Sequence, residues 1–167
     1  MGGRARLMNA TIEIPAPVTK SKIVEPAKRK ILLADDDPAI RRILSRLLAE
    51  EDYFVRTAAN GVEAFELATA TKFDLVLLDL NLPVKDGWET FVRLSTKNLL
   101  LPFILITGRP GQFFSALAAG VGALLEKPLN FTELFYTIHN LLEEPAEARL
   151  ARSLGRASMF GYVPLNG

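Results

Sequence analysis

Six polar residues, each at or just after the end of a short apolar run, are the part of this sequence that can do chemistry. They are Asp35, Asp36, Asp37, Asp79, Thr107 and Lys127. Carboxylates bind hard divalent cations, a hydroxyl donates a hydrogen bond to a phosphoryl oxygen, and an ammonium neutralises its charge. A carboxylate can also act as a nucleophile and form an acyl phosphate. The combination indicates phosphoryl transfer assisted by a metal ion.

The three consecutive acids follow the apolar run "ILLA" and directly precede Pro38. Asp37 has a structural explanation, because a short acceptor followed by proline is typical of a helix start. Asp35 and Asp36 have none, and a cation between them would relieve their repulsion. The sequence has no cysteine and no histidine nearby, so the ligands would be oxygen atoms and the ion Mg²⁺ or Mn²⁺. Taken alone, this stretch fits a solvated acidic loop equally well.

Five apolar runs of strand length have to position these residues. They cover residues 31–34, 53–58, 73–79, 102–107 and 122–127. Runs as continuously apolar as these are typical of a parallel sheet that is covered on both faces. Helical segments separate them, which predicts a doubly wound (βα)₅ domain within residues 29–144. The carboxyl ends of its strands, where open α/β sheets bind ligands, would gather the polar residues at one edge.

The segments between the predicted strands carry clear helix signals. Asn60, Asp86 and Asn130 each stand three residues before a glutamate, as is typical of a helix N-terminus. Two apolar stripes at helical spacing are expected to face the sheet. They consist of Ile40, Ile43, Leu44, Leu47 and Leu48, and of Phe131, Leu134, Phe135, Ile138, Leu141 and Leu142.

The segment from Lys28 to Glu144 resembles the receiver domain of two-component response regulators. The acidic pair after the first strand, Asp79, Thr107 and the sequence Lys127-Pro128 carry the resemblance. It implies a flavodoxin-like (βα)₅ doubly wound parallel sheet with strand order 2-1-3-4-5. It also implies a phospho-acceptor switch with autophosphatase activity, and not an enzyme that acts on an external substrate.

The resemblance also implies roles for individual residues. The residue that matches Asp79 accepts a phosphoryl group from a sensor histidine kinase or a phosphotransfer protein. By the same resemblance Mg²⁺ is bound by Asp36, by Asp79 and by the backbone carbonyl of Asn81, and by Asp35 through water. Every position of the family's site is filled in this chain.

Two features of the sequence depart from the family pattern. Thr107 matches a hydroxyl that moves onto the phosphoryl group, and Lys127 matches the family's lysine. The position three residues before that lysine is usually aromatic and moves with the hydroxyl, but here it is Leu124. The stretch between Thr107 and Lys127 is also shorter than usual, which predicts a shortened or irregular fourth helix.

These departures keep open the alternative of a receiver-like adaptor that binds its partners without phosphorylation. A third interpretation is a Mg²⁺-dependent phosphatase with an aspartyl nucleophile. Such phosphatases typically need a second acid two residues after the nucleophile, where this chain has Asn81.

Charge is distributed unevenly along the chain. Residues 1–30 carry a net charge of +5 and residues 146–167 a net charge of +2, so the middle carries −6. We expect a flexible basic arm over residues 1–27, the receiver domain over 28–144, and a short helix plus an apolar tail over 145–167. The tail either frays or binds a partner. A DNA-binding output domain does not fit into the last 22 residues.

The sequence contains no run of 18 apolar residues and no signal-peptide pattern. We therefore expect a cytoplasmic protein without a membrane span. Its expected partners are the kinase or phosphotransfer protein and an unknown downstream protein, and a homodimer stays open. Among the remaining residues, Phe113 and Phe114 are expected in the core and His139 on the surface.

Overall fold

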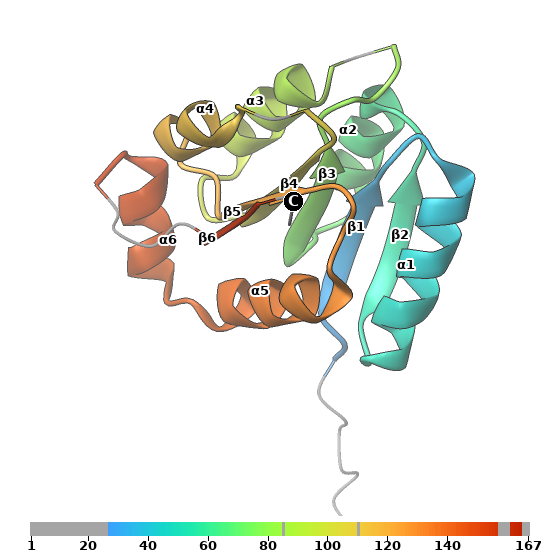
Figure 1. Ribbon diagram of the computed structural model, residues 1–167. Coiled ribbons are helices and arrows are strands. Elements are labelled where there is room, and N and C mark those ends of the chain that lie inside the picture. Colours follow the sequence, from blue (N-terminus) through green and yellow to red (C-terminus); the bar gives the residue numbers. More distant parts are fainter. Residues whose placement is uncertain (1–26, 85, 110, 157–160, 165–167) are drawn as a thin grey trace, which may run out of the picture.

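The computed structural model describes residues 27–84, 86–109, 111–156 and 161–164. They form one parallel sheet of order β2-β1-β3-β4-β5-β6 with helices on both faces (Figure 1). The strands are β1 Lys30–Ala34, β2 Phe54–Ala58, β3 Leu75–Asp79, β4 Phe103–Thr107, β5 Ala123–Glu126 and β6 Gly161–Val163. The helices are α1 Pro38–Glu50, α2 Gly61–Ala70, α3 Gly87–Lys97, α4 Phe113–Ala118, α5 Phe131–Glu143 and α6 Ala146–Ser153. The predicted fold class and the order 2-1-3-4-5 are confirmed, with one strand added.

The central strands are buried on both faces, as their continuous apolar sequences predict. Alternate residues of β1 and β3 enter two separate cores, because successive side chains of a strand point to opposite faces. Leu32 and Val76 pack toward α2, α3 and α4, whereas Ile31 and Leu75 pack toward α1 and α5. Burying each such side chain contributes about 2 kcal/mol of favourable transfer free energy. Two filled cores hold the strand ends in place.

The predicted helix starts at Asn60, Asp86 and Asn130, and the one at Asp37, are all confirmed. Each side chain accepts a hydrogen bond from a backbone N–H of the first turn, such as Asp37 Oδ1 from Ala39 N at 2.7 Å. The apolar stripes are correct in their centres, with Leu44 and Leu134 fully buried. They are wrong at the flanks, because Ile43 and Phe131 are exposed. Ile43 lies about a quarter-turn away from Leu44, at the edge of the stripe.

Helix α4 is short, with six residues, as the spacing between Thr107 and Lys127 predicts. The core prediction for its first two residues is only half right. Phe113 is half-buried and packs against the core, but Phe114 is 78 % exposed. A helix of so few turns cannot direct two adjacent rings toward the sheet, since neighbouring residues point about 100° apart.

The C-terminal segment returns to the sheet, which the sequence did not predict. Helix α6 follows α5, and Arg149 Nη2 donates hydrogen bonds of 2.8 Å to the carbonyls of Leu141 and Leu142 at the end of α5. Strand β6 then pairs in parallel with β5 and extends the sheet (Figure 1). Residues 161–163 of the expected apolar tail are therefore part of the sheet.

The expected basic arm falls almost entirely on residues 1–26, which lie outside the described residues. In the part of the chain that the structure describes, none of the helices is both long and apolar enough to cross a membrane.

Candidate functional site

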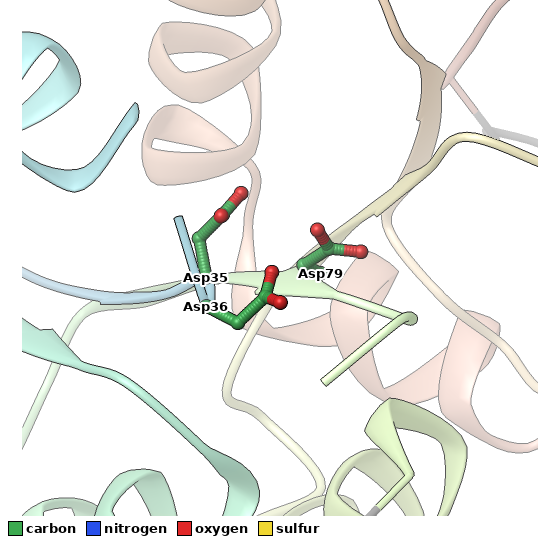
Figure 2. A group of neighbouring side chains, drawn as sticks. All are labelled: Asp35, Asp36 and Asp79. Atoms are coloured by element: carbon green, nitrogen blue, oxygen red, sulfur yellow. The ribbon is translucent and has the colours of Figure 1, made fainter. Parts of the chain in front are cut away.

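The carboxyl ends of β1 and β3 bring three predicted site residues together. The two strands are neighbours, with Ala34 opposite Leu78, so Asp35 follows β1 next to Asp79 at the end of β3. One carboxylate oxygen from each of Asp35, Asp36 and Asp79 lies within 4.8 Å of the others. Figure 2 shows the three side chains grouped at this edge of the sheet. Asp35 and Asp79 are 0 % and 1 % exposed, whereas Asp36 is open to solvent.

The two buried acids are held in matching ways. Oδ1 of Asp35 accepts a hydrogen bond from Asp37 N at 2.9 Å, and Oδ1 of Asp79 accepts one from Asn81 N at 2.8 Å. Each side chain thus bonds to the backbone two residues further on, which fixes its orientation. The second oxygen of each acid then faces Lys127.

Lys127 follows β5 and joins the two acids. Its Nζ donates hydrogen bonds to Oδ2 of Asp35 at 3.0 Å and to Oδ2 of Asp79 at 2.5 Å. The side chain is 28 % exposed, so the ammonium lies at the mouth of the site. The peptide bond from Lys127 to Pro128 is cis.

The site carries more negative than positive charge. Burial raises the pKa of Asp35 above its ordinary value, and the hydrogen bonds from Asp37 N and Lys127 offset this only in part. Burial lowers the pKa of Lys127, but its hydrogen bonds with Asp79 and Asp35 outweigh this effect and leave the pKa raised. The two shifts have different causes: burial dominates at Asp35, and the two carboxylate partners dominate at Lys127. An additional cation would be stabilised at this position.

The residues fit a hard divalent cation. The donors in reach of one another are carboxylate oxygens, which Mg²⁺ and Mn²⁺ prefer. Asp36 is solvent-exposed beside two buried carboxylates, so a partly hydrated ion has access to the cluster. The three carboxylates could bind the ion from the protein side and leave its solvent side to water, and Mg²⁺ usually keeps several of its water ligands.

Thr107 lies at the end of β4, and its hydroxyl is bonded within its own loop. Oγ1 donates to the carbonyl of Arg109 at 3.2 Å and accepts from the N–H of Arg109 at 3.0 Å. The side chain is buried and comes from the strand next to β3, but the hydroxyl has no hydrogen bond with Asp79. The structure thus brings the acids and Lys127 together. The Thr107 hydroxyl would have to give up its hydrogen bond to the Arg109 carbonyl before it could donate to a group at Asp79.

Two residues that support the site escaped the sequence analysis. A Cβ on Gly87 would lie 2.5 Å from Leu80 Cα and would also collide with the carbonyl oxygen of Asp79, so only glycine allows α3 to start there. Arg41 Nη1 donates a hydrogen bond of 2.6 Å to the carbonyl of Asp35. The pair "DG" at a helix start could have pointed to Gly87, whereas no local pattern points to Arg41.

Comparisons with known proteins agree with this geometry. Residues 31–139 match the protein family described as the response regulator receiver domain. A CheY-like response regulator receiver domain protein from Methanospirillum hungatei JF-1 superposes with a TM-score of 0.68 at 31 % identity, covering 72 % of this chain and 98 % of that one. The response regulator TrrA from Thermotoga maritima, solved in complex with Mg²⁺-BeF, gives a TM-score of 0.64 at 32 % identity, covering 68 % of this chain and 98 % of that one.

Longer proteins also contain a similar segment. The transcriptional regulatory protein GlrR of Escherichia coli (strain K12) is 35 % identical over 121 residues, which are 71 % of this chain and 27 % of GlrR. The transcriptional regulatory protein TcrA of Mycobacterium tuberculosis (strain ATCC 25618 / H37Rv) is 33 % identical over 114 residues, 67 % of this chain and 45 % of TcrA. The chain thus spans about a quarter to just under half of the length of these relatives.

Proposed function

The chain belongs to the response regulator receiver domain family of two-component signalling, and we propose that Asp79 is the residue that accepts the phosphoryl group. One observation carries this proposal. The Asp79 carboxylate stands at the centre of the site, hydrogen-bonded to Lys127 and within 4.8 Å of the other two acids. Asn81 N holds its other oxygen, so the carboxylate is oriented before any donor arrives.

The reaction that this arrangement supports is a phosphoryl transfer from a phosphohistidine. An Asp79 oxygen forms a bond to phosphorus while the bond between phosphorus and the donor imidazole nitrogen breaks, and its electron pair returns to that nitrogen. Lys127 moves from the carboxylate to a phosphoryl oxygen and neutralises its charge. The Thr107 hydroxyl turns from the carbonyl of Arg109 to another phosphoryl oxygen.

Asp36, Asp79 and the backbone carbonyl of Asn81 would hold Mg²⁺ directly, and Asp35 would hold it through water. When bound, the ion supplies positive charge that compensates the phosphoryl oxygens. The buried acids of the chain then no longer repel each other or the incoming group. Water that enters by the open side at Asp36 would hydrolyse the acyl phosphate, which is the autophosphatase activity that we assign to the domain.

We assign residues 28–144 to a receiver domain that works in the cytoplasm, accepts its phosphoryl group from a histidine kinase or phosphotransfer protein, and signals by protein contacts. Two observations favour the alternative of an adaptor independent of phosphorylation. Leu124 stands where the family usually has an aromatic residue, so no aromatic side chain can respond to Thr107 there, and α4 has only six residues. Partner affinity that is unchanged by beryllofluoride, a phosphoryl analogue, would favour the adaptor.

The test of the main proposal is phosphorylation by acetyl phosphate in the presence of Mg²⁺, measured by mass spectrometry of the intact chain. We expect a mass gain of one phosphate in the native chain and none in Asp79→Asn. Asp86→Asn, which changes an exposed acid on the loop after the same strand, should keep the full gain. A gain that persists in Asp79→Asn would contradict the proposal.

A further inference from the structure

Strand β6 pairs with the outer edge of β5 and begins with a glycine in close contact with that strand. Gly161 lies opposite Ala123, and its N–H donates a hydrogen bond of 3.1 Å to the carbonyl of Gly122. A Cβ at position 161 would lie 3.0 Å from Ala123 Cβ, which is tighter than an ordinary van der Waals contact, so a bulky side chain there would press the strand away from β5. The seat is close-fitting but only three residues long.

Tyr162, in the middle of β6, bridges two elements that lead to the candidate site. Its hydroxyl donates a hydrogen bond of 3.0 Å to Glu126 Oε1 at the end of β5. Its ring meets the ring of Phe113 edge to face, with centroids 4.9 Å apart. Glu126 immediately precedes Lys127, and Phe113 is the first residue of α4. The side chain therefore contacts both the strand that carries the lysine and the helix that follows Thr107.

Both contacts of Tyr162 connect back to groups that we expect to move on phosphorylation. Thr107 lies opposite Glu126 in the sheet, and Lys127 N donates a hydrogen bond of 2.8 Å to the Thr107 carbonyl. The Thr107 hydroxyl holds both backbone groups of Arg109 in the loop that leads to α4. If the hydroxyl proton turns to a phosphoryl oxygen, the bond to the Arg109 carbonyl is lost. The loop that leads to α4 then loses one of its two hydrogen bonds to Thr107, so the start of α4 and the ring of Phe113 shift relative to Tyr162.

We propose that β6 is a latch that is seated on β5 when Asp79 is unmodified and that leaves this edge when Asp79 carries a phosphoryl group. The proposal rests on the proposed function of Asp79. A three-residue edge strand needs little free energy to open, so loss of the Phe113 contact is enough to shift its equilibrium. Opening uncovers the backbone edge of β5 next to Phe113. Since coupling is reciprocal, a chain with β6 removed binds a phosphoryl analogue more tightly.

The first test is amide hydrogen exchange of the full chain with and without beryllofluoride and Mg²⁺. We expect faster exchange in residues 161–163 and in β5 when the analogue is bound, and no change in α1. Fluorescence of Trp88, the single tryptophan, reports binding independently, because its indole N–H donates a hydrogen bond to Gln112 directly before α4. Binding with unchanged or slower exchange in β6 overturns the latch alone. Absence of any binding overturns the proposed function of the site, and the latch with it.

The second test measures beryllofluoride affinity in variants that weaken the seat. Tyr162→Ala removes the ring contact and Gly161→Val removes the space against Ala123, and each should bind the analogue about fivefold more tightly. Tyr162→Phe keeps the ring and should show a smaller gain. The control is Ile43→Ala, which truncates an exposed side chain of α1, a helix that packs on β1 and β2, and should leave the affinity unchanged. Equal affinity in all four variants contradicts the latch.

Discussion

Two groups of charged side chains at opposite ends of the sheet differ in how their charges are balanced. The acidic rim consists of Asp35, Asp36, Asp79 and Lys127, and the C-terminal clamp consists of Glu144, Arg149 and Arg152. The rim follows the carboxyl ends of β1 and β3. The clamp lies at the amino ends of β4 and β5, where Ser153 Oγ donates a hydrogen bond of 2.7 Å to the carbonyl of Leu99 and the Arg152 carbonyl packs against Gly120.

The rim has three carboxylates for one ammonium, so its surplus is negative. In the clamp, two guanidinium groups face one carboxylate. Glu144 pairs with Arg152 and lies 4.0 Å from Arg149 Nε, and Arg149 Nη2 donates to the carbonyls at the end of α5. The clamp therefore has a surplus positive charge, and its contacts hold α6 against α5. The rim is the opposite case, because the fold holds like charges together that only a cation or a reaction can relieve. Surplus negative charge thus marks the functional end of the sheet, whereas at the structural end the surplus is positive and the guanidinium groups join α6 to α5.

The largest effect is expected in the clamp. Arg152→Met leaves Glu144 buried without its strongest partner, so we expect the free energy of unfolding to fall by about 3 kcal/mol in urea denaturation. The double variant with Glu144→Gln should recover most of the loss, since both charges are then gone. Arg46→Met, which breaks an exposed pair with Glu50, should cost no more than about 0.5 kcal/mol. Equal losses in Arg152→Met and Arg46→Met would show that the buried pair of Glu144 and Arg152 stabilises the fold no more than the exposed pair does.

A smaller loss is expected in the rim. Lys127→Met removes the ammonium shared by Asp35 and Asp79, but the side chain is partly exposed, so we expect the free energy of unfolding to fall by about 2 kcal/mol. Mg²⁺ should restore part of this loss in Lys127→Met and none of the loss in Arg152→Met. Such a difference in thermal melting curves would confirm that only the rim accepts a cation. If Mg²⁺ restored the stability of both variants, the rim and the clamp would not differ in their ability to bind a cation.

Substitutions of two glycines test whether the close contact between α3 and the end of β3 positions Asp79. Gly87→Ala places a methyl group against the backbone of Asp79 and Leu80, so we expect a loss of about 1 kcal/mol in stability and slower phosphorylation by acetyl phosphate. Gly108→Ala is the matched control at the same end of the sheet, because its Cβ would meet nothing closer than the Asn81 side chain at 3.8 Å. If both variants are phosphorylated at the native rate, the position of Asp79 does not depend on this contact.

The smallest effect concerns the pH dependence of β6. Partial burial raises the pKa of Tyr162, and the hydrogen bond and negative charge of Glu126 raise it further. Glu133 and His139 of α5 line the groove beside the same ring, and α4 contributes no charged residue. The neutral phenol is therefore favoured in the folded chain, so the contact is complete below pH 10 and is lost as the pH rises through the higher pKa.

This shift is measurable by spectrophotometric titration of the tyrosines, comparing the native chain with Tyr162→Phe. Glu126→Gln should lower the pKa of Tyr162 toward its ordinary value. An unchanged titration curve in Glu126→Gln would mean that the hydroxyl bond to β5 is not maintained in solution.

Most of the fold and of the rim could be predicted from local patterns. A buried parallel strand needs a continuous apolar run, and a polar residue at the end of such a run is conspicuous, so Asp35, Asp79, Thr107 and Lys127 stand out in the sequence. Helix caps are equally local, which is why the helix starts predicted at Asn60, Asp86 and Asn130 are confirmed. The parallel order of the strands then brings the residues at their ends to one edge.

The remaining features depend on contacts between residues that are distant in the chain. Three residues such as Gly161–Val163 have too short a pattern to predict a strand, and they pair with β5 because α5 and α6 return the chain to that edge. The exposure of Phe114 and the sharing of one ammonium by Asp35 and Asp79 also arise from packing. Residue types and their spacing establish which chemistry is available to this protein, since those properties are local. Which groups touch at rest depends on long-range packing, because a hydrogen bond or an ion pair exists only where the folded backbone brings its two partners within reach.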